Sequence, residues 1–271
     1  MGDVRKELTR VLEDACEEVD RRLGAFLAKP DDVETIHKLR ISIRTLRSLL
    51  SFVSPLLKRR RHRLLQDDLR SVVIETSRLR EYDVMLRDVR ALGSPSGELV
   101  ARIGELRELE RNRVVGVMDG RHTRRALRRV RRRVKALPWK DSVRRRGVTR
   151  ADVLAVFDEL VRTVDEGYAA VDRTDADAVH TLRKRAKRVR YVAEAFCALL
   201  GERAVAEGAR MKGVQDELGD VCDARVNAEM ARDLLDLGLS DEARGALEVL
   251  LGQSQALVDA FVTGARPGGV K

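Results

Sequence analysis

Aromatic residues are scarce in this sequence of 271 residues, which holds five Phe, three Tyr and one Trp. Sites for single-stranded nucleic acid stack successive bases on aromatic rings, so this scarcity argues against such a platform. The three cysteines, Cys16, Cys197 and Cys222, are widely separated, and none forms the C-x-x-C spacing of zinc or redox sites. We therefore expect buried or inert thiols in a reducing compartment.

Apolar runs and sequence signals for export are also missing. No stretch reaches the roughly 18 apolar residues that a membrane span needs, and no signal peptide opens the chain. These features predict a cytoplasmic protein with no membrane partner.

Sequence motifs of common catalytic sites are absent as well. The chain has no P-loop, no G-x-G-x-x-G and no G-x-S-x-G, and its four histidines show neither metal-binding spacing nor H-E-x-x-H. We expect no catalytic residue, no metal and no cofactor, and predict a binding protein rather than an enzyme.

What the sequence does have is positive charge. Lys and Arg number 54 against 44 Asp and Glu, a net charge of +10. Only ten of the 54 cations are lysines, so 44 are arginines, whose planar fork binds phosphate oxygens in a bidentate manner. A GC-rich genome would also favour Arg over Lys. The positions of the arginines, and not their number, must therefore show whether they bind phosphate.

The pattern of apolar residues predicts an all-α protein punctuated by five prolines. Helices are expected at 4–29, from a cap at Asp31 or Asp32 to Ser54, at 57–92, in two segments between 98 and 136 that break near Asp119, and at 149–173, 175–200, 202–237 and 240–264. Residues 138–147 read as a basic linker, and 265–271 as a disordered tail.

An internal repeat is the most informative feature. Residues 36–50, IHKLRISIRTLRSLL, align with residues 179–193, VHTLRKRAKRVRYVA, at an offset of 143. Downstream, Arg70 aligns with Lys212 at an offset of 142. A duplication predicts two pseudo-symmetric four-helix bundles, in residues 1–147 and 148–264.

Each repeated helix carries an apolar seam with a cationic stripe beside it. The seams are Ile36, Leu39, Ile43, Leu46, Leu50 and Val53, and Val179, Leu182, Ala186, Val189, Ala193 and Phe196. The stripes follow one residue later, at His37, Arg40, Arg44 and Arg47, and at His180, Arg183, Lys187 and Arg190.

Neither stripe has acidic partners along its own helix. No Asp or Glu occurs between residues 38 and 50 or between 182 and 193. Like charges at i,i+4 cost roughly 0.2–0.5 kcal/mol per pair, so the repetition indicates that a bound polyanion supplies the negative charge. The alternative is a plain solvated face.

Other charged clusters are less specific. Two basic runs, KRRRHR at 58–63 and RRVRRR at 128–133, resemble nucleic-acid patches, but on helices their charges point to all sides. Acidic residues gather at Asp83 and Asp88 and again between Asp216 and Asp223. They suit a metal site for hydrolysis or, as we prefer, partners that orient arginines.

The two H-x-x-R-x-x-x-[RK]-x-x-R helices resemble those of the CHAD domain, the conserved histidine α-helical domain. The segments 69–84 and 211–226 resemble the third-helix motifs of its two halves, and the resemblance covers about residues 5–263. The family's Leu-Gly is kept at Leu218 and Gly219 but replaced by Thr76 and Ser77 in the first half, where Glu81 replaces an Asp. We therefore expect packing and arginine orientation near Glu81 to differ.

The resemblance implies two bundles whose basic helices face a central cavity that binds inorganic polyphosphate, inside the cell and at polyphosphate granules, where protein partners are possible. A fused CYTH triphosphate-processing domain is not indicated, because its E-x-E-x-K signature is absent. The expected ligand-binding residues are His37, Arg40, Arg44, Arg47, Arg70, His180, Arg183, Lys184, Lys187, Arg188, Arg190 and Lys212. A nucleic-acid binder is the first alternative, and a polyphosphate-processing enzyme is the second.

Overall fold

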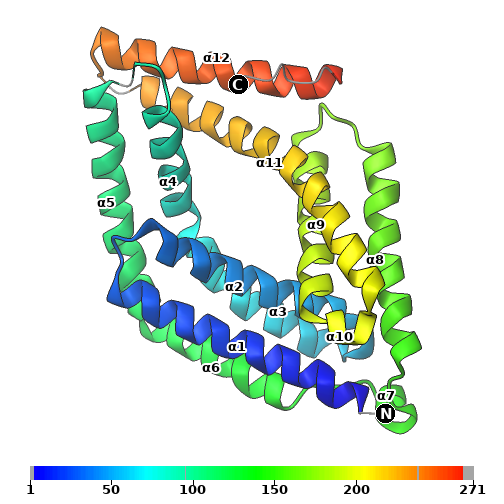
Figure 1. The fold of residues 1–271 in the computed structure, drawn as a ribbon. Helices are drawn as coiled ribbons and strands as arrows, with labels where there is room; N and C mark the ends of the chain where they lie inside the picture. Colours follow the sequence, from blue (N-terminus) through cyan, green and yellow to red (C-terminus); the bar gives the residue numbers. More distant parts are fainter. Residues whose placement is uncertain (1–2, 95, 237, 265–271) are drawn as a thin grey trace.

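The computed structural model describes residues 3–94, 96–236 and 238–264, so the tail predicted at 265–271 lies outside the described residues. Within them the chain is all-α, as predicted, with a single isolated β-bridge between Leu57 and Trp139. The helices are α1 Val4–Ala28, α2 Val33–Phe52, α3 Arg59–Val73, α4 Ser77–Arg90, α5 Gly97–Asp119, α6 Arg121–Lys135, α7 Asp141–Arg146, α8 Arg150–Ala170, α9 Ala176–Ala195, α10 Cys197–Leu200, α11 Glu202–Leu235 and α12 Asp241–Thr263. Figure 1 shows them arranged with α7 and α12 at opposite ends of the molecule.

Helix boundaries follow the capping residues of the sequence. Asp32 caps α2 by accepting a hydrogen bond from the backbone N–H of Glu34 at 2.9 Å. Thr149 and Asp152 form a reciprocal capping box at the start of α8. The predicted break near Asp119 is confirmed, since α5 ends there and α6 begins at Arg121.

Three predicted boundaries are wrong. The expected single helix at 57–92 is divided into α3, the 3₁₀ turn Ile74–Thr76 and α4, and the expected helix at 175–200 is divided into α9 and α10. The predicted linker at 138–147 contains α7. Two backbone hydrogen bonds hold the start of the 138–147 segment against the segment before α3. The Lys58 N–H donates to Pro138 O at 2.8 Å, and the Lys140 N–H donates to Leu56 O at 2.9 Å.

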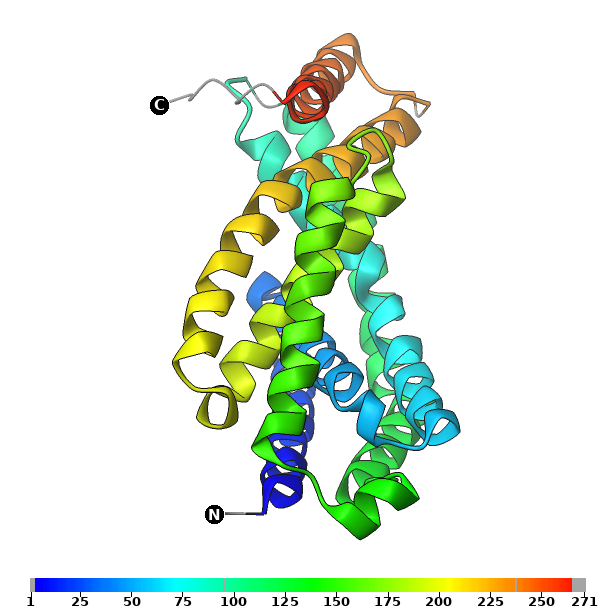
Figure 2. The same ribbon diagram turned by 90° about the vertical axis from the view of Figure 1, so that its right-hand side faces the viewer.

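The hydrophobic core does not divide into one bundle per sequence half. The larger cluster includes buried residues of α1, α2, α3 and α6 together with those of α8, α9 and α11. A smaller cluster joins α4 and α5 to α12 and the C-terminal part of α11. Each cluster therefore takes residues from both halves, and in Figure 2 α11 runs from the α10 end toward α12.

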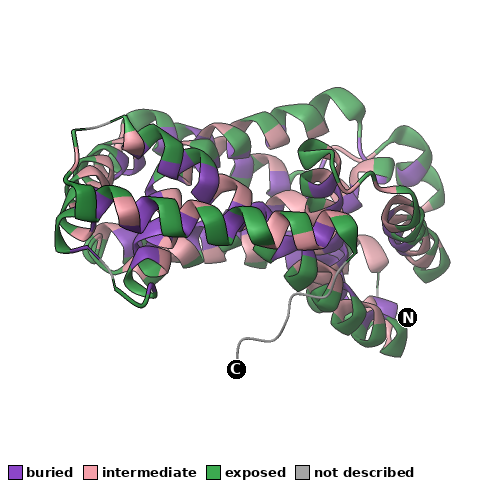
Figure 3. Ribbon diagram, turned by 90° about the horizontal axis from the view of Figure 1, so that it is seen from above, coloured by how far each residue is buried: buried purple, intermediate pink, exposed green. Residues whose placement is uncertain are grey.

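Buried residues lie on the inward faces of the helices, and exposed residues cover the outer faces (Figure 3). Cys16 and Cys222 are buried as expected, whereas Cys197 is exposed. Burial raises the pKa of the Cys16 thiol to about 12. Among the described helices, none is both long enough and apolar enough to cross a membrane.

Candidate functional site

The two repeated helices, α2 and α9, pack against each other, and they cross rather than run parallel (Figure 1). All twelve predicted seam residues are buried, which confirms the seams. At one end Phe52 and Phe196 pack together with ring centroids 5.3 Å apart. This contact places part of each cationic stripe, Arg44 and Arg47 of α2 and His180, Arg183 and Lys187 of α9, at the edge of a shared space.

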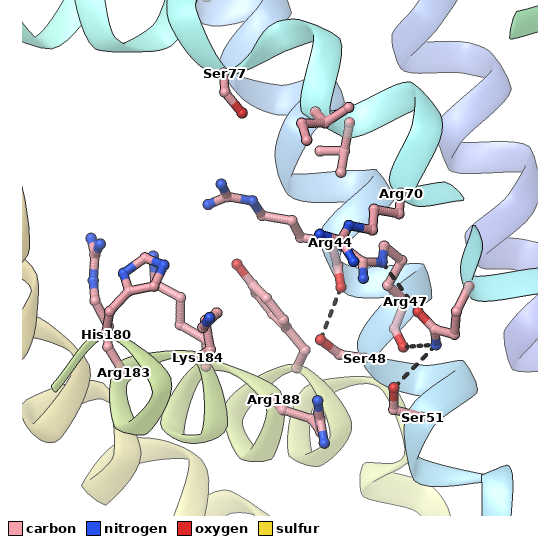
Figure 4. Close-up of a pocket in the computed structure, with 15 residues that line it drawn as sticks. Arg44, Arg47, Ser48, Ser51, Arg70, Ser77, His180, Arg183, Lys184 and Arg188 are labelled. Atoms are coloured by element: carbon pink, nitrogen blue, oxygen red, sulfur yellow. Dashed lines mark hydrogen bonds between the residues drawn. The ribbon is translucent and has the colours of Figure 1, made fainter. Parts of the chain in front are cut away.

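That space is a cavity of about 280 Å³ between α2, α9 and the α3–α4 segment. Figure 4 shows Arg44 and Arg47 reaching it from α2, Arg70 from α3, and His180 and Lys184 from α9. Its lining residues are Arg44, Arg47, Ser48, Ser51, Gln66, Arg70, Val73, Ile74, Ser77, His180, Arg183, Lys184, Lys187, Arg188 and Tyr191. Eight of the twelve predicted ligand-binding residues therefore meet at one place.

The cavity wall is cationic and polar. Seven of its residues are Arg or Lys, and none of the fifteen described lining residues is Asp or Glu. Among the described residues, only Arg183 of these seven has a carboxylate within 4 Å, with its Nη2 3.4 Å from an Asp223 oxygen. Elsewhere pairing is common, as on α6, where Arg129 and Arg133 both bind Asp68.

This crowding of like charges changes the protonation of Lys187. Burial, with Arg183 and Arg44 nearby, lowers the pKa of Lys187 to about 8. Burial also lowers the pKa of Arg44, and the positive charge of Arg183 acts in the same direction. An anion in the cavity would reverse both effects because it favours the charged forms.

The two predicted histidines differ in position. His180 lines the cavity, whereas His37 does not. Burial lowers the pKa of both rings, and nearby cations add to the effect: chiefly Arg80 at His37 and Lys184 at His180. Both rings are therefore neutral at pH 7, and each can donate one hydrogen bond.

Four predicted residues lie outside the cavity lining: His37, Arg40, Arg190 and Lys212. Arg190 lies near Glu194, 3.8 Å away, with its guanidinium over the ring of Tyr191. Lys212 is exposed on α11. Arg40 is buried, and its Nη1 donates to Thr76 Oγ1 at 2.6 Å.

The Arg40 contact explains why the two halves differ. Thr76 and Ser77 stand where the second half has Leu218 and Gly219, and their hydroxyls lie 2.6 and 3.4 Å from Arg40 Nη1. Thr76 Oγ1 also donates to the Val73 carbonyl at 2.7 Å, a bond of the kind that bends helices. The helical segment breaks here into α3 and α4. In the second half, α11 continues without a break through Leu218 and Gly219, and Arg183 remains at the cavity.

The expected change near Glu81 is also seen. Glu81 lies 3.4 Å from Arg78 on its own helix, whereas Asp223, its counterpart, pairs with the cavity residue Arg183. The two equivalent carboxylates therefore have different partners, one within its own helix and one at the cavity.

Sequence reasoning missed several cavity residues. Ser48 and Ser51 extend the α2 stripe beyond Arg44 at helical spacing, so a longer count along the stripe would have found them. Gln66 donates to the Arg47 carbonyl at 2.8 Å and accepts from Arg47 Nε at 3.1 Å, which holds that guanidinium in place. Ser77 was singled out only as a departure from the family's Leu-Gly, and nothing in the sequence pointed to Tyr191.

Three of the clustered acidic residues, Asp83, Asp88 and Asp223, pair with arginines, whereas Glu217 accepts a hydrogen bond from Tyr168. Asp83 accepts from Arg107 at 2.7 Å, and Asp88 accepts from Asn227 at 2.6 Å. Within the described residues, no group of three or more His, Cys, Asp or Glu has the arrangement of a metal site.

Comparison with known proteins identifies relatives. The CHAD domain family profile matches residues 10–232. The crystal structure of the CHAD domain from the plant Ricinus communis superimposes with a TM-score of 0.74 at 20% identity, covering 96% of this chain and 90% of that one. PptA from Streptomyces chartreusis superimposes with a TM-score of 0.72 at 18% identity, covering 96% of both chains.

No curated protein matches the sequence. At these identities the structural similarity concerns the fold, while the family profile spans most of the chain, including both striped helices. The repeated H-x-x-R helices, the all-α architecture and the profile match agree, and the chain belongs to the CHAD domain family.

Proposed function

We propose that this protein binds inorganic polyphosphate in the cavity between α2 and α9, without chemically changing it. The observation that carries the proposal is the cavity wall, which gathers seven Arg and Lys side chains and no carboxylate among its described residues. The resemblance of both striped helices to the polyphosphate-binding helices of the family supports the same ligand.

A linear phosphate chain suits this wall better than a compact anion. Cations reach the cavity from α2, α3 and α9, so a chain can meet several of them in succession. Arginine forks and lysine ammonium groups both bind phosphate oxygens, and Ser48, Ser51 and Ser77 add neutral donors.

The two alternatives receive less support. A single-strand nucleic-acid site needs aromatic faces, and Tyr191 is the one aromatic residue among the described lining residues. Enzymes that process phosphate chains commonly hold a metal ion with carboxylates, and the described lining residues include no Asp or Glu to bind one. We therefore propose that the protein binds polyphosphate in the cytoplasm, at the granules in which polyphosphate accumulates.

The direct test is thermal unfolding with and without polyphosphate. A ligand that binds only the folded state at 100 times its dissociation constant stabilises it by about 2.7 kcal/mol. For a chain of this length we expect the melting temperature to rise by about 5 °C or more. Added salt should reduce the rise, because binding releases counterions. Orthophosphate at equal ionic strength is the control, and an unchanged melting curve at low salt would contradict the proposal.

The affinity should depend on pH through Lys187. Its pKa is about 8 in the free protein, and the bound anion holds it protonated, so binding takes up a proton above pH 8. We expect affinity to fall as pH rises, to about one tenth of the pH 7 value at pH 9. Lys187→Arg keeps the charge at every pH and should flatten the profile. Titrations at fixed ionic strength measure this, and a variant profile as steep as the wild type would exclude Lys187 as the cause.

A further inference from the structure

A second basic hollow lies outside the cavity, and we call it the outer groove. It occupies about 780 Å³ between the start of α3, the end of α6 and α7. Its cations are Lys58, Arg61, Arg132, Arg133, Lys135 and Arg144, and the described lining residues include no Asp or Glu. It shares no lining residue with the cavity.

Helix α3 separates the two sites. Gln66 and Arg70, four residues apart, line the cavity, whereas Arg61 lines the outer groove on the side where Asp68 meets α6. Arg61 and Asp68 are seven residues apart and share one face, and at about 100° per residue this face points about 160° away from Gln66 and Arg70. A ligand in the groove therefore leaves the cavity free.

Most of the groove's charge is not neutralised by the protein. Lys58 pairs with Asp141 at 3.0 Å, and Arg133 pairs with Asp68. Within the described residues, the other four cations have no carboxylate within 4 Å. Arg61, Arg132 and Lys135 are exposed, so they can reach a ligand without rearrangement of the core.

The walls of the groove are held by backbone contacts. The bridge between Leu57 and Trp139 joins the segment before α3 to the segment after α6. This contact holds the start of α3 next to the end of α6, so cations from distant parts of the chain lie on one surface.

We propose that the outer groove is a second polyphosphate site, which lets one protein molecule hold two phosphate chains or two segments of one chain. The inference rests on the proposed function of the cavity. The groove favours a bare phosphate chain over single-stranded nucleic acid, because Trp139 is its one aromatic residue among those described, and stacking of successive bases needs several. Two sites facing apart cross-link long chains, as multivalent binding requires.

The test uses the full chain and a groove variant, Arg61→Ser, Arg132→Ser and Lys135→Ser. A matched control removes three exposed cations near the opposite end, with Arg90→Ser, Arg232→Ser and Arg244→Ser. Calorimetric titration with a short polyphosphate should give about two chains per protein for the wild type and control, and about one for the groove variant. Light scattering with long-chain polyphosphate should show large particles that the groove variant does not form.

The possible outcomes separate failure of the outer-groove proposal from failure of the cavity proposal. Equal stoichiometry and scattering in the groove variant and the control would overturn the second site while leaving the cavity proposal intact. If the groove variant keeps its polyphosphate stoichiometry but loses binding to a single-stranded RNA of equal charge, the groove is a nucleic-acid site and the inference is wrong. Loss of the cavity's own binding is tested separately with substitutions at Arg44 and Lys187.

Discussion

Replacing Arg44 and Lys187 by glutamate is expected to lower the affinity of the cavity for polyphosphate about a thousandfold, measured with Arg61→Ser, Arg132→Ser and Lys135→Ser in the background so that the outer groove does not contribute. The two residues line the cavity from α2 and α9, so the double variant reverses one charge on each repeated helix. Lys187 is half-buried and Arg44 is exposed at the cavity edge, so we take about 2 kcal/mol for each lost ion pair, the lower end of the range for buried pairs, and two such losses give about 4 kcal/mol. Each 1.4 kcal/mol is a factor of ten in affinity.

The fold should survive these changes, because they relieve repulsion. Arg44 and Lys187 each lie near Arg183, and neither has a carboxylate within 4 Å among the described residues. We expect the ligand-free double variant to keep its helical circular dichroism and to melt at or above the wild-type temperature.

The control for this variant needs cations that pair with nothing and line neither site. Arg129 is unsuitable, because it binds Asp68 and its reversal would break that pair. Arg90→Glu and Arg244→Glu reverse the same amount of charge on exposed positions of α4 and α12. Equal loss of affinity in both double variants would show that diffuse charge, and not the cavity, binds the polyanion.

The seams and the stripes could be predicted from the sequence because they depend on helical periodicity alone. Once Ile36 and Val179 begin their seams, every later position follows from the repeat of about 3.6 residues per turn, and all twelve residues are buried. The meeting of Arg44 with Lys187 needed one further assumption, that duplicated helices pack together, which the larger hydrophobic cluster supports.

The remaining features depend on contacts that periodicity does not encode. Arg40 has the same spacing as Arg183, yet a hydroxyl 36 residues later draws it into the core. The break of the third helix has the same origin in Thr76. The outer groove could not be predicted for a similar reason. Arg61 and Arg132 belong to two basic runs that are far apart in the sequence, and they share a surface because the backbone bridge between Leu57 and Trp139 brings the two segments together.

Affinity is expected to rise steeply with the number of phosphates and then to level off. The polar cavity residues of α9 extend from His180 to Arg188, eight residues or about 12 Å of helix, and the cavity cations of α2 and α3 lie opposite. Pyrophosphate can meet only a few of these cations at once. A longer polyphosphate that has bound one wall meets the other wall at high effective concentration, which raises the overall affinity about 10²–10⁴-fold.

A ladder of polyphosphate lengths titrated at one ionic strength measures this rise, with duplex DNA of equal charge beside it. The duplex should bind more weakly than the long chain, because it is far wider than a single row of phosphates and cannot enter a cavity of about 280 Å³. The Arg44→Glu, Lys187→Glu variant should show a weaker dependence on length, because the cavity then no longer offers a cation pair from the two repeated helices. Pyrophosphate binding as tightly as the long chain would rule out two cooperating walls, and tighter binding of the duplex would make nucleic acid the ligand in place of polyphosphate.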